Sequence, residues 1–387
     1  MRIGVDATCW LNNRGYGRHA RSLLAALVRG DTRNQYVFFI DSPDAIPLLP
    51  ERVEVRQVCT SAPANVSASA NGRRRLADIW RMGRALSRAN CDVLLFPTVY
   101  TYVPTVSRAK KLVMVHDIIA ETFPELTLPR RTARYLWKAK VGLSMFQADA
   151  LITVSDYSRA GIQRHFKVAP QQLFVVSEAS DPIFRRLENP EMTEALRACG
   201  VPARGRLITY VGGFGPHKNI DALVAAFGAL ARKFNDIALV LVGEYRNEVF
   251  HTAYQEIRAQ VDRLGAGARV IFTGYLADED LVVLLNRSFA LALPSLMEGF
   301  GLPAVEAAAC GCPVVATKES PLPSLLGGAG IFIEPERAAL ENALETMLSN
   351  HALWNHMRPA ALAAAARLSW DAAAAQMMAV IEQVAAQ

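Results

Sequence analysis

Several common features are missing from this chain of 387 residues. Its six cysteines show no C-x-x-C spacing and have no histidine-rich tract beside them, so we expect neither a cysteine-based metal site nor a disulfide framework. No apolar run reaches the roughly 18 residues needed to span a bilayer. The opening MRIGVDA enters a strand directly, so we expect no signal peptide. These absences predict a soluble, cytoplasmic protein with free thiols.

The motifs of several enzyme classes are also incomplete. The segment GGFGPHKN resembles a phosphate-binding P-loop, but His217 stands where that loop needs glycine and Asn219 where it needs a hydroxyl for magnesium. The turn Gly15-Tyr16-Gly17-Arg18 lacks the third glycine of a dinucleotide fingerprint. No G-x-S-x-G nucleophile motif occurs. We therefore disfavour a kinase or ATPase, a dinucleotide-dependent oxidoreductase and a serine hydrolase.

The net charge is a modest +6, from 42 basic and 36 acidic residues. Such an excess fits an anionic small ligand or surface better than dedicated nucleic-acid binding. One basic cluster is interleaved with apolar side chains, and it is either a solvated helix face or a peripheral contact with the inner face of an anionic membrane. Its members are Arg130, Arg131, Arg134, Tyr135, Trp137, Lys138, Lys140, Leu143, Met145 and Phe146.

Apolar strand-like runs alternate with helical patterns along the whole chain, which predicts an α/β fold with doubly wound parallel sheets. The polar segment 181–202 reads as a linker. We expect domains at 1–185 and 186–368 and a terminal helix at 369–387. The expected strands are 3–6, 36–40, 53–58, 92–96, 112–115, 151–154, 173–176, 207–211, 238–242, 269–273, 289–293, 314–316 and 330–333. The expected helices of the first half are 17–29, 74–89, 130–147 and 158–165.

The stretch PSLMEGFGLPAVEAAACGCPVVAT, residues 294–317, holds two carboxylates at a predicted strand–loop–helix junction. Pro303 near the first helical position and Gly311 past the end predict a short helix. Glu298 then lies on a glycine-bearing loop at the carboxyl end of a strand, where ligands bind in open α/β sheets. Glu306 falls in the first turn or so of the helix. Both carboxylates could bind hydroxyls of a polyol, although Glu306 alone would also suit the helix dipole.

Two further segments carry candidate site residues. Lys218 follows a glycine-rich turn at a predicted helix start, which suits a diphosphate, and Asn219 could cap that helix. His116-Asp117 ends another strand. Such a histidine is either a satisfied core residue or, facing a site, a group that steadies developing charge.

These motifs resemble those of the retaining glycosyltransferases of glycosyltransferase family 4, which have the GT-B fold. The resemblance rests on PS-x-x-EGFGLP-x-x-EA-x-A-x-G-x-PV, on VG-x-x-x-P-x-KN around Lys218, and on the His-Asp pair. It implies two Rossmann-like domains facing a central cleft, with the terminal helix returning to the acceptor-side N-terminal domain. It also implies a retaining transfer of a hexose from a nucleotide-diphosphate sugar to a hydroxyl of a glycan, lipid-linked or small-molecule acceptor.

The resemblance assigns roles to individual residues. Glu298 would lie beside the transferred sugar, Glu306 would bind the ribose, and Lys218 would bind the diphosphate. His116 would contact the sugar or the leaving phosphate, which makes His116, Lys218 and Glu298 the candidate catalytic residues. The remaining candidate donor-binding residues are Gly15, Gly17, Asp117, Gly213, Asn219, Gly299, Phe300, Gly301, Leu302 and Glu306.

This chain departs from the family pattern where an arginine is frequent, since it has Gly213 and His217, and at Ser324, where glutamate is frequent. A non-catalytic sugar-nucleotide-binding module and another GT-B enzyme such as an epimerase therefore stay open as alternatives. No Asp-x-Asp in a strand–loop setting is present, so no metal or other cofactor is expected. The opening RIGVDA…GYGR resembles polysaccharide mannosyltransferases, which makes GDP-mannose the first donor to test.

Overall fold

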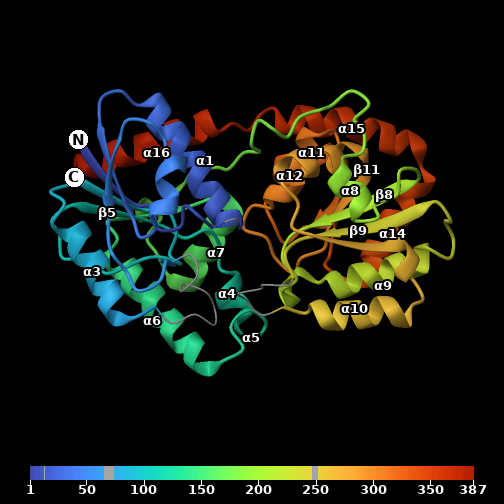
Figure 1. The fold of residues 1–387 in the computed structure, drawn as a ribbon, viewed down its shortest axis with the longest axis horizontal. Coiled ribbons are helices and arrows are strands. Elements are labelled where there is room, and N and C mark those ends of the chain that lie inside the picture. Colours follow the sequence, from blue (N-terminus) through green and yellow to red (C-terminus); the bar gives the residue numbers. More distant parts are fainter. Residues whose placement is uncertain (13, 65–73, 246–251) are drawn as a thin grey trace. The chain divides into compact units, whose positions relative to one another are not determined.

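The computed structural model describes residues 1–12, 14–64, 74–245 and 252–387. It divides into two compact units, and each is an α/β domain (Figure 1). The first unit comprises Met1–Glu178 together with Ser369–Gln387, and the second comprises Ala179–Leu368. The segment 181–202, expected as a linker, lies within the second unit and contains the short helix α8 (Glu194–Ala198).

The first unit is built on a seven-stranded parallel sheet with the order β3-β2-β1-β4-β5-β6-β7. The expected strands are all present, and the central strand β4 is a continuous buried apolar run. The strands are β1 (Arg2–Asp6), β2 (Gln35–Ile40), β3 (Val53–Gln57), β4 (Val93–Phe96), β5 (Lys110–Met114), β6 (Ala150–Thr153) and β7 (Leu173–Val175).

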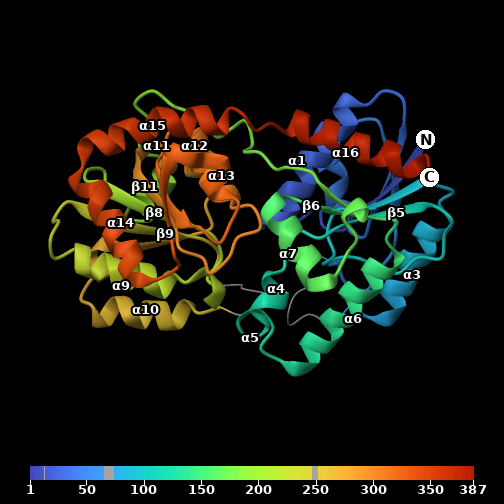
Figure 2. The same cartoon turned by 180° about the vertical axis from the view of Figure 1, so that it is seen from behind.

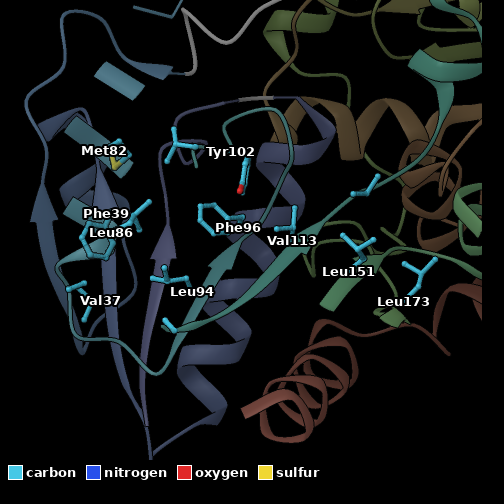
Figure 3. Close-up of a cluster of buried hydrophobic side chains, with 14 of the residues drawn as sticks. Val37, Phe39, Met82, Leu86, Leu94, Phe96, Tyr102, Val113, Leu151 and Leu173 are labelled. Atoms are coloured by element: carbon cyan, nitrogen blue, oxygen red, sulfur yellow. The ribbon is translucent and has the colours of Figure 1, made fainter. Parts of the chain in front are cut away.

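Helices cover both faces of this sheet, with α1 and α16 on one face and α3 and α6 on the other (Figure 1). The longer helices are α1 (Gly15–Gly30), α3 (Leu76–Ser87), α6 (Arg131–Gln147), α7 (Asp156–Phe166) and α16 (Trp370–Ala385), and the short ones are α4 (Ile119–Thr122) and α5 (Pro124–Thr127). The core on the α3 face joins side chains of α3 to those of β2, β4, β5, β6 and β7 (Figure 3).

The terminal helix belongs to the first unit. α16 begins after Ser369, whose hydroxyl accepts a hydrogen bond from the N–H of Ala372, and it packs along α1 (Figure 1). The split of the Ala-rich C-terminal segment near Ser369-Trp370 and the return of the last helix to the N-terminal domain are thus confirmed.

The second unit is built on a six-stranded parallel sheet with the order β10-β9-β8-β11-β12-β13. Its strands are β8 (Arg206–Val211), β9 (Ile237–Val242), β10 (Val270–Gly274), β11 (Ser288–Leu293), β12 (Val314–Thr317) and β13 (Gly330–Ile333). In both sheets the strand order reverses beside the first strand of the unit. Two Rossmann-like halves are therefore present, as expected.

Helices cover both faces of the second sheet as well. α9 packs with α10 and α14, whereas α15 packs against α12 and α13 (Figure 2). The helices are α9 (Ile220–Leu230), α10 (Tyr254–Arg263), α11 (Asp278–Arg287), α12 (Leu302–Ala309), α13 (Leu322–Leu326), α14 (Arg337–Ser349) and α15 (His351–Ala365).

Candidate functional site

The two most informative motifs follow neighbouring strands of the second sheet. β8 and β11 lie side by side where the strand order reverses, and such a switch point is where open α/β sheets bind ligands. Lys218 lies in a 3₁₀ turn, Pro216–Lys218, after β8, and Glu298 lies in the loop after β11. The topology alone therefore brings these two side chains to one edge of the sheet.

Lys218 and Glu298 form an ion pair. The Lys218 Nζ atom donates to Oε1 of Glu298 over 2.6 Å, and the Ser295 hydroxyl donates to the same oxygen over 2.6 Å. The side chains are 20% and 10% exposed, so the pair is shielded from water on most sides. Among the described residues no hydrogen bond reaches the second carboxylate oxygen of Glu298, which is thus available to a hydroxyl donor.

Backbone and amide hydrogen bonds fix the two loops against each other. The N–H of Leu296 donates to the carbonyl of His217 over 2.9 Å. The Asn219 amide donates to the carbonyls of Pro294 and Pro335 over 3.0 and 2.9 Å. Asn219 does occupy the N-cap position of α9, but its side chain makes no cap hydrogen bond, so its expected capping role is corrected to loop bridging.

The loop of the EGFGLP segment needs its second glycine. Gly301 has φ +85°, which L side chains rarely adopt, and a Cβ there would lie 2.8 Å from a methyl group of Leu322. Gly301 is the residue before α12, and Pro303 occupies its first turn. Glu306 is buried and is the fifth residue of α12, just after its first turn and close to where it was expected.

The remaining candidate donor-binding residues of this unit are placed as follows. Phe300 and Leu302 are buried hydrophobic residues of the second unit, and their donor-binding role stays a prediction. The Gly213 carbonyl accepts a hydrogen bond from the Tyr210 hydroxyl over 2.6 Å. Gly299 directly follows Glu298 in the same loop. The structure therefore gathers Gly213, Lys218, Asn219, Glu298, Gly299, Gly301 and Glu306 around the ends of β8 and β11.

The first unit holds the other four candidates. Gly15 and Gly17 open α1, where a Cβ on Gly17 would lie 2.0 Å from the carbonyl oxygen of Asn12. Asp117 accepts a hydrogen bond from the N–H of Ile119 over 2.8 Å. His116 follows β5, and its Nε2 lies 3.0 Å from the carbonyl oxygen of Pro97.

Sequence reasoning missed two residues that contact His116 or lie within a few ångströms of it. His19 lies in α1 with its ring edge-on to that of His116, and the two ring centroids are 4.9 Å apart. Glu178 places Oε1 3.8 Å from His116 Nδ1 and 2.8 Å from His19 Nδ1. Although burial opposes ionisation, the neighbouring histidines lower the pKa of Glu178 to about 2. The three residues come from distant segments, so no spacing in the sequence could signal the cluster.

Comparison with known families agrees with this architecture. The family model described as "Glycosyltransferase Family 4" matches residues 13–182, and the model described as "Glycosyl transferases group 1" matches residues 192–364. Together the two models span most of the chain and match one segment in each unit. They confirm the resemblance to glycosyltransferase family 4 that the motifs around Lys218 and Glu298 indicated.

Individual relatives are similar in sequence, and solved structures share the fold. O-antigen chain mannosyltransferase B of Escherichia coli is 29% identical over 257 residues, which covers 66% of this chain and 66% of that protein, slightly less than two thirds of its length. The structure of sucrose-phosphate synthase from Thermosynechococcus elongatus matches with a TM-score of 0.78 at 20% identity and covers 100% of this chain and 99% of that one. Anabaena Alr3699/HepE in complex with UDP-glucose matches with a TM-score of 0.74 at 18% identity, covering 99% of each chain. These matches confirm the expected GT-B fold.

Proposed function

We propose that this protein is a retaining glycosyltransferase whose second unit binds a nucleotide-diphosphate sugar. The observation that carries this proposal is the shielded Lys218–Glu298 ion pair at the switch point, with Glu306 buried on the adjoining helix. A cation there suits the diphosphate, and carboxylates suit the hydroxyls of the sugar and ribose. The transferred group would be a hexose, and the acceptor a hydroxyl of a glycan, a lipid-linked molecule or a small molecule.

The pairing of Lys218 with Glu298 suggests how the donor is received. Without donor, each charge is compensated by the other at 2.6 Å. When a diphosphate binds, the ammonium group of Lys218 would turn part of its hydrogen-bonding capacity to phosphate oxygens. The Glu298 carboxylate, still held by Ser295, would then accept hydrogen bonds from the sugar hydroxyls.

We propose that the reaction retains the anomeric configuration. Oε1 of Glu298 accepts hydrogen bonds from Lys218 and Ser295, and its second oxygen would accept hydrogen bonds from the sugar hydroxyls. A carboxylate engaged at both oxygens favours front-face attack by the acceptor over a covalent glycosyl intermediate on Glu298. The leaving phosphate would take the acceptor proton. Analysis of the product linkage by NMR tests whether the anomeric configuration is retained, and an inverted linkage would contradict the proposal.

The transfer is also proposed to need no divalent metal at the diphosphate, because Lys218 and backbone amides meet the leaving-group charge. Activity should persist when magnesium and manganese are omitted from the assay. A strict requirement for added Mg²⁺ or Mn²⁺ would show that another group carries this role.

GDP-mannose is the donor we propose first. The support is the identity to O-antigen chain mannosyltransferase B together with the RIGVDA…GYGR opening. UDP-glucose is the natural comparison, because Anabaena HepE was solved with it.

A panel of GDP-, UDP-, ADP- and dTDP-sugars, scored by thermal shift and by donor hydrolysis, tests the function. One nucleotide sugar should raise the melting temperature and be slowly hydrolysed. Binding of the donor with neither hydrolysis nor transfer to any of a range of acceptors would instead favour the non-catalytic binding module. Conversion of the donor to another sugar nucleotide would favour the epimerase.

A peripheral membrane contact is proposed for the α6 face of the first unit. Among the described residues no helix is long and apolar enough to cross a bilayer. Phe146 and Tyr135 on α6 are nevertheless 86% and 71% exposed, and Leu136 beside Tyr135 is exposed too. Basic side chains accompany them, notably Arg130, Arg131 and Lys138, so the face combines apolar anchors with positive charge.

Sedimentation with lipid vesicles tests this contact. Binding should be seen with vesicles containing phosphatidylglycerol and should be weak with pure phosphatidylcholine. Phe146→Asp should weaken binding about tenfold, the loss expected when one aromatic anchor no longer leaves water. Tyr275→Asp, at an exposed aromatic residue of the second unit, is the matched control and should bind normally. Equal binding to both vesicle types would contradict the proposal.

A further inference from the structure

Three side chains of the first unit converge on one point although they come from distant segments. His19 lies in α1, His116 follows β5, and Glu178 follows β7 as the last residue before the second unit. One donor atom from each lies within 4.8 Å of the other two. His19 and Glu178 are buried and His116 is nearly so, with 12% of its side chain exposed.

His19 is not satisfied by the protein around it. The residue is fully buried, yet neither ring nitrogen has a hydrogen-bond partner among the described residues. Nδ1 does lie 2.8 Å from Oε1 of Glu178, but the oxygen is not aligned to accept a hydrogen bond from it. A buried polar group left in this state costs about 1–3 kcal/mol, so it needs an explanation such as a bound ion.

The second histidine has the orientation of a metal ligand. Its Nε2 lies 3.0 Å from the Pro97 carbonyl, and because a carbonyl only accepts, Nε2 carries the proton. The lone pair is then on Nδ1, which faces Glu178 at 3.8 Å. A ring N–H donated to a backbone carbonyl is the usual way in which proteins orient a metal-bound histidine.

Glu178 completes the set with a negative charge. A buried carboxylate needs a cation or several hydrogen bonds. Two ligands at about 2.1 Å from a tetrahedral ion lie about 3.4 Å apart. Oε1 of Glu178 lies 2.8 Å from His19 Nδ1, unaligned as a hydrogen bond, and 3.8 Å from His116 Nδ1, so the two distances fall on either side of that separation.

We propose that His19, His116 and Glu178 bind one divalent transition-metal ion, with Zn²⁺ favoured by the two-imidazole, one-carboxylate donor set. Such an ion would link three segments of the first unit: the first turns of α1, the loop after β5 and the segment after β7. Trp370 at the start of α16 also packs on His19, with ring centroids 5.5 Å apart, so the ion would support the returning helix. The inference does not depend on the proposed transfer reaction, and it places no metal at the donor diphosphate.

Metal analysis of the full chain, purified without a histidine tag, tests the proposal. After incubation with one equivalent of Zn²⁺ and gel filtration, about one zinc per chain should remain. Replacement by Co²⁺ should give the visible absorption of a low-symmetry protein site, and removal of the metal should lower the melting temperature. Less than a tenth of an equivalent, with no Co²⁺ spectrum, would overturn the proposal without any variant being needed.

Variants show whether retained metal occupies this site. His19→Gln and Glu178→Gln should each lose the stoichiometric zinc and the Co²⁺ spectrum. His165→Gln, at an exposed histidine of α7 in the same unit, is the matched control and should retain both. Zinc retained equally by all three variants would be adventitious and would also overturn the proposal. If the first two variants unfold, the wild-type Co²⁺ spectrum decides.

Discussion

Replacing Glu298 by glutamine should have opposite effects on nucleotide binding and on turnover. In the structure Glu298 competes for Lys218, because the two side chains are joined at 2.6 Å. Glutamine keeps the shape and the hydrogen bond from Ser295 but removes the negative charge. The ammonium group is then free to bind a diphosphate, and the anionic ligand no longer approaches a carboxylate.

The size of the effect follows from the exposure of the pair. Surface ion pairs contribute about 0–1 kcal/mol, and hydrogen bonds to charged groups contribute about 1.5–3 kcal/mol. Lys218 and Glu298 lie between these cases, since their side chains are 20% and 10% exposed. Part of the ion pair survives when the nucleotide binds. We therefore expect the pair to weaken nucleotide binding by about 1 kcal/mol, which is about fivefold in affinity.

Isothermal titration calorimetry with GDP and UDP alone measures this effect, because no sugar is present to contact Glu298. Glu298→Gln should bind the preferred nucleotide about fivefold more tightly, whereas Lys218→Ala should bind it more weakly. Glu345→Gln is a matched control, since Glu345 pairs with the exposed Lys233. Weaker binding to Glu298→Gln than to the wild type would refute the view that the two groups compete.

Two further predictions concern stability. Gly301→Ala should lower the free energy of unfolding of the second unit by about 1–3 kcal/mol, because alanine must adopt φ +85° with its Cβ 2.8 Å from Leu322. Thermal unfolding checks this, with Gly328→Ala as a control whose Cβ would meet only Ala360 at 3.9 Å. Burial raises the pKa of Glu121 from 4.5 to about 7, so the folded state binds more protons than the unfolded state between these values and stability falls as pH rises through them. Glu121→Gln should therefore have a higher melting temperature than the wild type at pH 8 and a similar one at pH 4. A higher melting temperature of the variant at pH 4 alone would contradict the predicted pH dependence.

The strands were predictable from the sequence to within a few residues. Parallel strands covered on both faces are continuous apolar runs, and runs such as those of β9 and β11 are fully buried in the structure. Glycine and proline also marked the limits of α12 correctly. Short helices such as α8 were missed, since five residues are too few to establish a periodic pattern.

The candidate site was predictable where residues follow neighbouring strands. Lys218 and Glu298 were expected at one rim, but not as a pair bonded to each other, because an ion pair depends on rotamers that no motif encodes. Asn219 was expected to cap α9 and instead bridges two carbonyls, since its positive φ turns the side chain away from the helix amides. The His19–Glu178 contact arises only from the tertiary fold.

Steady-state turnover of the wild type, Lys218→Ala and Glu298→Ala with the preferred donor and an acceptor tests the central claim most directly. Each variant should lose about a hundredfold or more, the loss of about 2.7 kcal/mol expected when one charged transition-state contact is removed. Lys233→Ala, which breaks only an exposed ion pair, should retain wild-type turnover. Near-normal turnover in both site variants would contradict the assignment of the donor site to the ends of β8 and β11.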